Sequence, residues 1–361
     1  MTSNDTVYRA VDVGYKGEHR PAMVYVGTLT DKGEIPEISA LQPGDVYQVM
    51  VLGENSVNSK HHCMLVTLDH ETGRITSKVI ECPIITNIGY TPATRVGDTV
   101  YVFGGGFSSR GDNLYAYSIE HKTWRQVHKR GQWPAARQGH SAFSLGGKLY
   151  IAGGHGRDSW SGCFRECWCY DTETGVWTRQ RDAPMELGGS ATVVVGDVVH
   201  IIGNRWHTFS LSRGWKGEAS TPFKCRYAGG VCVGMDIHIL GGRVTKGEVH
   251  VYNTKTKEWR QGGDLPVPVG KCRACLIRPR TLLVCGREGV LVGDVPLTPE
   301  ERREKERLVR EREDRKREEK ERLERERLER ERLKRLEAER QSLVTSLLSL
   351  GVSADALPPS P

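Results

Sequence analysis

Six short apolar runs, each ending at a glycine, recur through the first 296 residues of the chain. In three of them adjacent glycines follow the run: TVYVFGGG (Thr99–Gly106), KLYIAGG (Lys148–Gly154) and DIHILGG (Asp236–Gly242). Weaker copies complete the series, and the glycines stand at positions 53, 104, 153, 203, 241 and 286, which are 51, 49, 50, 38 and 45 residues apart. A repeat of this length is typical of a solenoid, a propeller or an array, in which each repeat is one supersecondary unit.

Each repeat has the composition of four short strands. A second apolar run precedes the one that ends in glycine, and the turn between them is Gly-Gly, Gly-Asp or Gly-Met, which suits a tight hairpin. A polar loop follows, and then a third strand leads through a turn into a tryptophan. In three repeats a tyrosine precedes this tryptophan by seven residues: Tyr117/Trp124, Tyr170/Trp177 and Tyr252/Trp259. In an earlier repeat Leu68 and Ile75 take these two places. Four antiparallel strands repeated around a ring make the blades of a β-propeller.

A strand that ends in a glycine pair and is followed by a spaced tyrosine and tryptophan resembles the repeat of the Kelch family. The resemblance covers roughly Val7 to Leu297, and three repeats carry the full pattern. It implies an all-β, Kelch-type β-propeller and a role in protein interaction. We expect six blades, the N-terminal VYRAVDVG lending a strand to the last one, because this closure removes two open sheet edges. Seven blades are the alternative if Val7–Thr30 forms a compressed blade of its own.

The segment SGCFRECWCYD (Ser161–Asp171) places three cysteines within seven residues, downstream of His155. Aligned on the tyrosine of the repeat, Cys167 and Cys169 fall on alternate positions of a third strand and therefore on one face. Cysteine packs as a small hydrophobe, so we expect these two residues in the core. Only Cys163, in the preceding loop, is a candidate for chemistry, and the sequence leaves its reactivity open.

No other motif predicts catalysis or a cofactor. Cys272 and Cys275 form a C-x-x-C, but they lie on an expected first strand, which favours a structural role. The paired glycines lack the helix and the Lys-Ser/Thr of a phosphate-binding loop. We find no G-x-S-x-G and no H-E-x-x-H. Some Kelch-like propellers are exported copper oxidases, whereas this chain starts without an export signal. We therefore predict a non-enzyme with no metal and no cofactor.

The loops between strands two and three, together with the links between blades, are expected to emerge at one end of the propeller. Basic residues recur in these segments, and a set of them around a central depression would suit an acidic or phosphorylated peptide, because guanidinium groups bind carboxylates and phosphates through paired hydrogen bonds. The predicted protein-binding residues are Arg110, Arg137, Arg157, Arg205, Arg226, Arg243 and Lys271.

The chain changes character after Pro296. Residues 300–340 hold 18 Lys or Arg and 16 Asp or Glu in fine alternation, a pattern that favours an exposed helix with opposite charges four residues apart. Leu323, Leu328 and Leu333 recur every five residues, which winds around a helix and does not form a coiled-coil seam. The acidic residues cancel the basic ones, so a nucleic-acid partner is not expected.

The end of this helix is more apolar. Leu336, Leu343, Leu347 and Leu350 approximate a spacing of three to four residues and predict a tip that docks on a partner or forms a homodimer. We thus expect three segments: a propeller over residues 1–298, a charged single helix or coiled-coil-like segment over 299–342, and a short apolar helix tip with a disordered tail over 343–361.

The N-terminus lacks a signal-peptide pattern, and no window is apolar enough for a membrane span, so we expect a cytoplasmic protein without a membrane span. The predicted function is a scaffold or adaptor of the cytoskeletal, polarity or trafficking type. The propeller would hold one or more partner proteins, and the helix would separate them from an oligomerisation or docking site. A substrate-recognition subunit of a ubiquitin ligase is one alternative, and a metal-dependent propeller enzyme is another.

Overall fold

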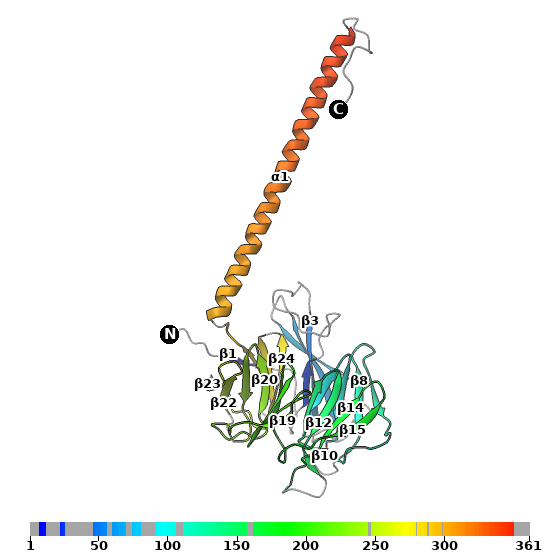
Figure 1. Cartoon of the computed structure of the whole chain (residues 1–361), viewed down its shortest axis with the longest axis vertical. Coiled ribbons are helices and arrows are strands. Elements are labelled where there is room, and N and C mark those ends of the chain that lie inside the picture. The colour runs from blue at the N-terminus through cyan, green and yellow to red at the C-terminus, as the bar shows by residue number, and fades with distance from the viewer. Residues whose placement is uncertain are drawn as a thin grey trace. The chain divides into compact units, whose positions relative to one another are not determined.

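The computed structural model contains two compact units, Met1–Pro296 and Leu297–Pro361 (Figure 1). It describes residues 7–11, 22–25, 46–55, 60–69, 74–80, 91–105, 111–156, 162–244, 247–278, 280–286, 289–297 and 299–349. The predicted boundary at residue 298 lies two residues from this division. The predicted division at residue 342 stays a prediction, since the helix of the second unit runs through it.

The described residues of the first unit form six four-stranded antiparallel sheets, the blades. Blade 1 contains β2 (Ala22–Tyr25), β3 (Val46–Asn55), β4 (Lys60–Asp69) and β5 (Ile75–Ile80). Blade 2 contains β6 (Ala93–Val96), β7 (Thr99–Phe103), β8 (Leu114–Ser118) and β9 (Thr123–Val127). Blade 3 contains β11 (Ser141–Leu145), β12 (Lys148–Ala152), β14 (Cys167–Asp171) and β15 (Val176–Gln180).

Blade 4 contains β16 (Ala191–Val195), β17 (Val198–Ile202), β18 (Trp206–Ser210) and β19 (Gly214–Gly217). Blade 5 contains β20 (Gly229–Val233), β21 (Asp236–Leu240), β22 (Glu248–Asn253) and β23 (Glu258–Asp264). Blade 6 contains β24 (Arg273–Arg278), β25 (Thr281–Gly286), β26 (Gly289–Asp294) and β1 (Val7–Val11). A small ladder joins β10 (Arg137–Gln138) to β13 (His155–Gly156).

The N-terminal strand closes the ring. β1 pairs antiparallel with β26, Val7 opposite Asp294 and Val11 opposite Val290. The next strand, β2, belongs to blade 1, so the segment predicted as an alternative seventh blade is divided between two blades. The first strands contact one another in the order β2, β6, β11, β16, β20 and β24, and β24 contacts β2. The fold class predicted from the sequence, a β-propeller followed by a single helix, is confirmed.

An aromatic pair joins the two outer strands in four blades. Tyr117 stands opposite Trp124, Tyr170 opposite Trp177 and Tyr252 opposite Trp259, and the ring centroids lie 5.0, 5.1 and 5.1 Å apart. In blade 4 Phe209 and Trp215 make the same pair at 4.9 Å. This pair does not match the tyrosine–tryptophan pattern of the other repeats, because its spacing is one residue shorter and phenylalanine replaces tyrosine.

The glycines at the ends of the second strands let the chain cross to the next blade. A Cβ on Gly153 would lie 2.3 Å from the carbonyl oxygen of Leu187, and one on Gly104 would lie 2.4 Å from that of Arg137. The amide N–H of Gly154 donates to the Leu187 carbonyl over 2.7 Å, and that of Gly105 donates to the Arg137 carbonyl over 3.0 Å. The link that enters the following blade therefore packs directly against the glycine pair. Glycine is needed there because a side chain would collide with the link.

The second unit contains α1 (Pro299–Ser349), a helix of 51 residues that begins at a proline, a residue suited to the first helical turn. Ion pairs four residues apart line it, among them Arg307–Glu311, Arg322–Glu326 and Arg327–Glu331. Leu323, Leu328 and Leu333 are exposed, as the five-residue spacing predicted. Within the described ranges, no helix is both long and apolar enough to cross a membrane.

We predict that Gly153→Ala destabilises the propeller far more than Gly147→Ala. Both glycines have positive φ, 70° and 72°, but a Cβ at Gly147 meets nothing within 4 Å. The Gly147 variant should lose about 1–2 kcal/mol of unfolding free energy, the cost of a left-handed L-residue. The Gly153 variant should lose about 1–3 kcal/mol more through the collision with the link. Urea denaturation measures both, and equal losses would contradict the crossing described above.

Candidate partner-binding pocket

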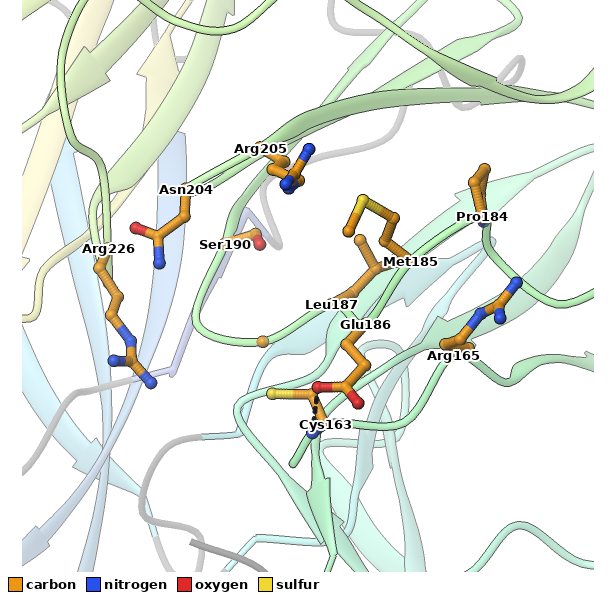
Figure 2. A pocket seen from close by; sticks show the side chains of 11 residues that line it. Cys163, Arg165, Pro184, Met185, Glu186, Leu187, Ser190, Asn204, Arg205 and Arg226 are labelled. Atoms are coloured by element: carbon orange, nitrogen blue, oxygen red, sulfur yellow. Dashed lines mark hydrogen bonds between the residues drawn. The ribbon is translucent and has the colours of Figure 1, made fainter. Parts of the chain in front are cut away.

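A pocket of about 450 Å³ lies at the end of the propeller that carries the links between blades and the loops between second and third strands (Figure 2). We call this end the link end. Its charged and amide side chains come from Arg165, Glu186, Asn204, Arg205 and Arg226. Apolar side chains come from Pro184, Met185 and Leu187, and the lining is completed by Cys163, Gly188 and Ser190. The pocket thus combines cationic groups with an apolar wall.

Four segments position these residues. Cys163 and Arg165 lie in the loop before β14, and residues 184–190 form the link between β15 and β16. Asn204 and Arg205 lie in the loop between β17 and β18, and Arg226 lies in the link before β20. Figure 2 shows Arg226 and Asn204 on one side and Arg165 and Pro184 on the other, with Met185, Leu187 and Glu186 between them.

Hydrogen bonds hold the link between β15 and β16 against the loop that precedes β14. The amide N–H of Ala183 donates to the Arg165 carbonyl over 2.7 Å, and that of Leu187 donates to the Phe164 carbonyl over 3.2 Å. The Cys163 amide N–H donates to Oε2 of Glu186 over 3.0 Å. Contacts between blade 3 and the link to blade 4 therefore fix the part of the pocket that residues 163–165 and 184–187 line.

Arg205 and Arg226 carry charge that no carboxylate among the described residues neutralises. In the part of the chain that the structure describes, neither guanidinium forms an ion pair with a carboxylate, whereas Arg179 pairs with Asp182 and Arg260 with Asp236. Arg226 lies over the ring of Tyr227, with Cζ 5.3 Å from the ring centroid. Unpaired guanidinium groups lining a pocket are suited to binding a carboxylate or phosphate from a ligand.

Cys163 and His155 are close without forming an activated pair. The Cys163 sulfur lies 3.4 Å from Nδ1 and 3.6 Å from Nε2 of His155. Since a sulfur on the lone pair of one ring nitrogen would be much farther from the other, this sulfur does not lie along either lone pair. Burial raises the pKa of the Cys163 thiol, Glu186 raises it further, and Arg226 opposes the shift. The geometry and the pKa thus leave a protonated thiol at neutral pH, which is a poor nucleophile.

The remaining cysteines of the motif pack in the core, as the repeat alignment predicted. Cys167 and Cys169 are buried between blades 3 and 4 with Phe143, Tyr150 and other apolar residues. Burial raises the pKa of Cys167 to about 12. Within the described ranges, no three His, Cys, Asp or Glu side chains are grouped in a way that could hold a metal ion.

Cys272 is structural, as predicted for the C-x-x-C. Its thiol donates to the carbonyl of Leu240 over 2.9 Å and accepts the amide N–H of Gly229 over 3.2 Å. Both partners belong to blade 5, so this thiol ties the entry of blade 6 to its neighbour. Burial raises the pKa of Cys275.

The structure corrects the prediction for Arg137. Its side chain is fully buried, with Nη2 donating to Oε2 of Glu166 over 2.6 Å and Nη1 donating to the Gly153 carbonyl over 3.0 Å. The guanidinium also lies 4.4 Å from the ring centroid of Phe164. Burial lowers the pKa of Arg137, and the hydrogen bond with Glu166 opposes that shift. Arg137 therefore ties the link that enters blade 3 to the segment between β12 and β14 of that blade, and it is not available to a partner.

The repeat alignment holds the signal that the sequence analysis missed. Arg137 stands four residues before its first strand, and Leu187, Cys225 and Val269 take that place in the next three repeats. All three are buried. A buried position in three sister repeats predicts a buried arginine here, which must then find an internal carboxylate.

The other predicted residues are distributed as follows. Arg205 and Arg226 line the pocket, and the amide N–H of Arg243, whose side chain is exposed, donates to the Arg226 carbonyl. Lys271 lies half-buried in the link before β24. Arg110, Arg157 and Leu350 fall outside the described residues, as does the side chain of Leu347, whereas Leu336 and Leu343 are exposed on α1. Glu186 and the apolar wall were missed because their link, PMELGG, carries no repeated polar signal.

We predict that Arg137→Gln lowers the unfolding free energy by about 3 kcal/mol, because it removes one partner of a largely buried ion pair. Arg205→Gln, which removes an exposed charge with no ion pair to a described residue, should change it by less than about 0.5 kcal/mol. Chemical denaturation of the two variants provides the comparison. An Arg137 variant with unchanged unfolding free energy would show that the pair with Glu166 does not stabilise the propeller.

Comparison with known proteins finds that the repeats are similar to those of Kelch-repeat proteins. Residues 45–221, from β3 to the end of blade 4, match the model of the KLHDC2/KLHL20/DRC7 Kelch-repeats domain. The chain is 26% identical over 221 residues to Kelch-like protein 25 of Xenopus tropicalis, covering 55% of this chain and 36% of that protein. It is 32% identical over 136 residues to Rab9 effector protein with kelch motifs of Xenopus laevis, covering 37% of this chain and 36% of that protein.

A third relative is Kelch domain-containing protein 3 of Bos taurus, 33% identical over 102 residues, which cover 27% of this chain and 26% of that protein. In the first two alignments the chain spans about a third of the length of the curated relative that it matches.

Proposed function

We propose that this Kelch-repeat β-propeller protein is a non-enzymatic interaction scaffold whose pocket at the link end binds an acidic segment of a partner protein. The observation that carries the proposal is the pair of guanidinium groups, Arg205 and Arg226, which line the pocket without a carboxylate partner among the described residues. The relatives support the class of function, since they too are described by their Kelch repeats, and one of them is named as an effector protein.

The pocket favours a particular kind of segment. Pro184, Met185 and Leu187 offer an apolar wall beside the two arginines. A peptide with an acidic side chain next to an apolar one would satisfy both surfaces, the first through charge-assisted hydrogen bonds and the second through burial of apolar area. The carboxylate of Glu186 lines the same pocket, so a second negative charge on the ligand would be repelled unless an arginine lay between them.

Two further parts of the proposal concern the compartment and the alternatives. The nine described cysteines are free of disulfides, which fits a reducing compartment such as the cytoplasm.

A role as the substrate-recognition subunit of a ubiquitin ligase would use the same pocket. The protonated thiol of Cys163 and the geometry of His155 offer no support for an enzymatic alternative.

We predict that Arg205→Glu combined with Arg226→Glu abolishes selection of acidic peptides. Peptides from a random phage library should carry Asp or Glu beside Leu, Met or Phe when selected on the full chain, and should bind the double variant at least about thirtyfold more weakly. Arg213→Glu is the matched control, because Arg213 is an exposed arginine in the turn between β18 and β19, at the opposite end. Peptides without acidic residues, or equal binding to the double variant, would refute the proposed pocket function.

We also propose that α1 is a spacer whose tip joins two copies of the chain. Its described leucines are exposed, including Leu336 at 52% and Leu343 at 65%, so the helix itself leaves them uncovered. Leu336, Leu343, Leu347 and Leu350 would bury against their equivalents in a second copy, since they share a spacing near that of a coiled-coil seam.

We predict that Leu336→Glu with Leu343→Glu converts the full chain from dimer to monomer in sedimentation equilibrium, because charges would enter the apolar seam. Leu323→Glu with Leu328→Glu is the matched control and should leave the dimer intact, since those leucines wind around the helix. A wild-type monomer at tens of micromolar would contradict the dimer proposal.

A further inference from the structure

Four residues other than glycine adopt positive φ in the described part of the chain: Lys122, Tyr227, Lys257 and Lys271. Lys122 and Lys257 occupy the turn between a third and a fourth strand, two residues before the paired tryptophan, where blade 3 has Gly175. Tyr227 and Lys271 lie instead in links, two residues before the first strands of blades 5 and 6. A tyrosine in the left-handed region is unusual, and a backbone conformation of this kind often marks a functional position.

The same link position in blades 3 and 4 is occupied by glycine. Gly139 and Gly189 have φ values of 64° and 66°, and Tyr227 has a φ of 59°. The amide N–H of Gly189 donates to the Gly139 carbonyl over 2.8 Å, and that of Tyr227 donates to the Gly189 carbonyl over 2.6 Å. The links thus share one backbone conformation that glycine adopts without strain. The backbone gives no reason for tyrosine in blade 5, so the reason lies in its side chain.

The ring of Tyr227 lies close to two neighbours. A Cβ on Gly189 would be 2.7 Å from Cε1 of Tyr227, so the ring occupies the space above that glycine. The guanidinium carbon of Arg226 lies 5.3 Å from the ring centroid, within the range of a cation–π contact. Arg226 in turn lines the pocket.

We propose that Tyr227 is a positioning residue, whose ring holds the guanidinium of Arg226 toward the pocket and so sets its affinity for a carboxylate. This inference rests on the proposed function of the pocket. It also explains the left-handed tyrosine: the conformation places the ring over Gly189, where it is fixed by packing, and the fixed ring limits the orientations of Arg226. A pre-oriented arginine loses less side-chain freedom on binding an anion.

The test uses the full chain and two labelled peptides, GSLDLSG and its uncharged counterpart GSLNLSG, in a fluorescence polarisation assay. Tyr227→Asn removes the ring but keeps a residue that tolerates positive φ. It should weaken binding of GSLDLSG by about tenfold, whereas Tyr227→Phe, which keeps the ring, should stay within about twofold. Lys257→Asn is the matched control, the same substitution at a left-handed residue of the opposite end, and should leave binding unchanged.

A double-mutant cycle separates positioning from a direct contact. In an Arg226→Gln background, Tyr227→Asn should change the affinity for GSLDLSG by less than about twofold, because the group that it positions is gone. Equal tenfold losses in both backgrounds would overturn the positioning role. If Arg226→Gln weakens binding while Tyr227→Asn does not, the inference fails and the pocket function stands. If neither substitution changes binding, the pocket function fails as well.

A measurement on the unmodified chain keeps the inference testable if Tyr227→Asn does not fold. In a spectrum of ¹⁵N-arginine-labelled protein, the Nε–H proton of Arg226 should be shifted upfield by the ring of Tyr227, relative to that of Arg205. Tyr227→Phe should preserve the shift. An Arg226 signal at the position of a solvent-exposed arginine would overturn the proposed contact.

Discussion

Each link between blades packs against the glycines at the end of a second strand in the preceding blade. The positions of the residues at the link end depend on this contact. At Gly104, Gly153 and Gly242 the amide N–H of a glycine at the strand end, or of the residue after it, donates to a link carbonyl, and Gly104 and Gly153 have no room for a side chain. Because the crossing is made by backbone, the residue that supplies the carbonyl can vary: it is Arg137, Leu187 or Val269. The repeat thereby fixes the path of the links and leaves their neighbouring side chains free to differ between blades.

The sequence predicted the fold because its strongest signals are also the physical determinants of a blade. Glycine pairs, hairpin turns and the tyrosine–tryptophan pair each specify a local contact that the structure contains, and the N-terminal strand closes the last blade as expected. Phe209 and Trp215 were missed because a shorter turn hides the same pair from a fixed spacing. The site was harder to predict. Arg137 and Arg226 look alike in a sequence, and only their places, four and three residues before a first strand, decide that one is buried and the other lines a pocket.

Arginines of the propeller stand in two kinds of surroundings. Arg137, Arg179 and Arg260 pair with carboxylates of the propeller, and Arg307 and Arg322 of α1 pair with glutamates four residues away. Such pairs satisfy the charge within the chain. Arg205 and Arg226 differ from them within the described ranges, because they line the pocket and form no ion pair there. The left-handed Tyr227 places its ring beside Arg226, for which the described residues provide no ion pair.

The most direct test of the recognition pocket observes the two arginines themselves. ¹⁵N-arginine-labelled protein is titrated with GSLDLSG while the Nε–H signals of Arg205, Arg226 and Arg137 are followed. Our account predicts that the signals of Arg205 and Arg226 shift with the same dissociation constant, that the buried signal of Arg137 does not move, and that GSLNLSG leaves all three in place. Saturating binding of GSLDLSG with the Arg205 and Arg226 signals unmoved would contradict it.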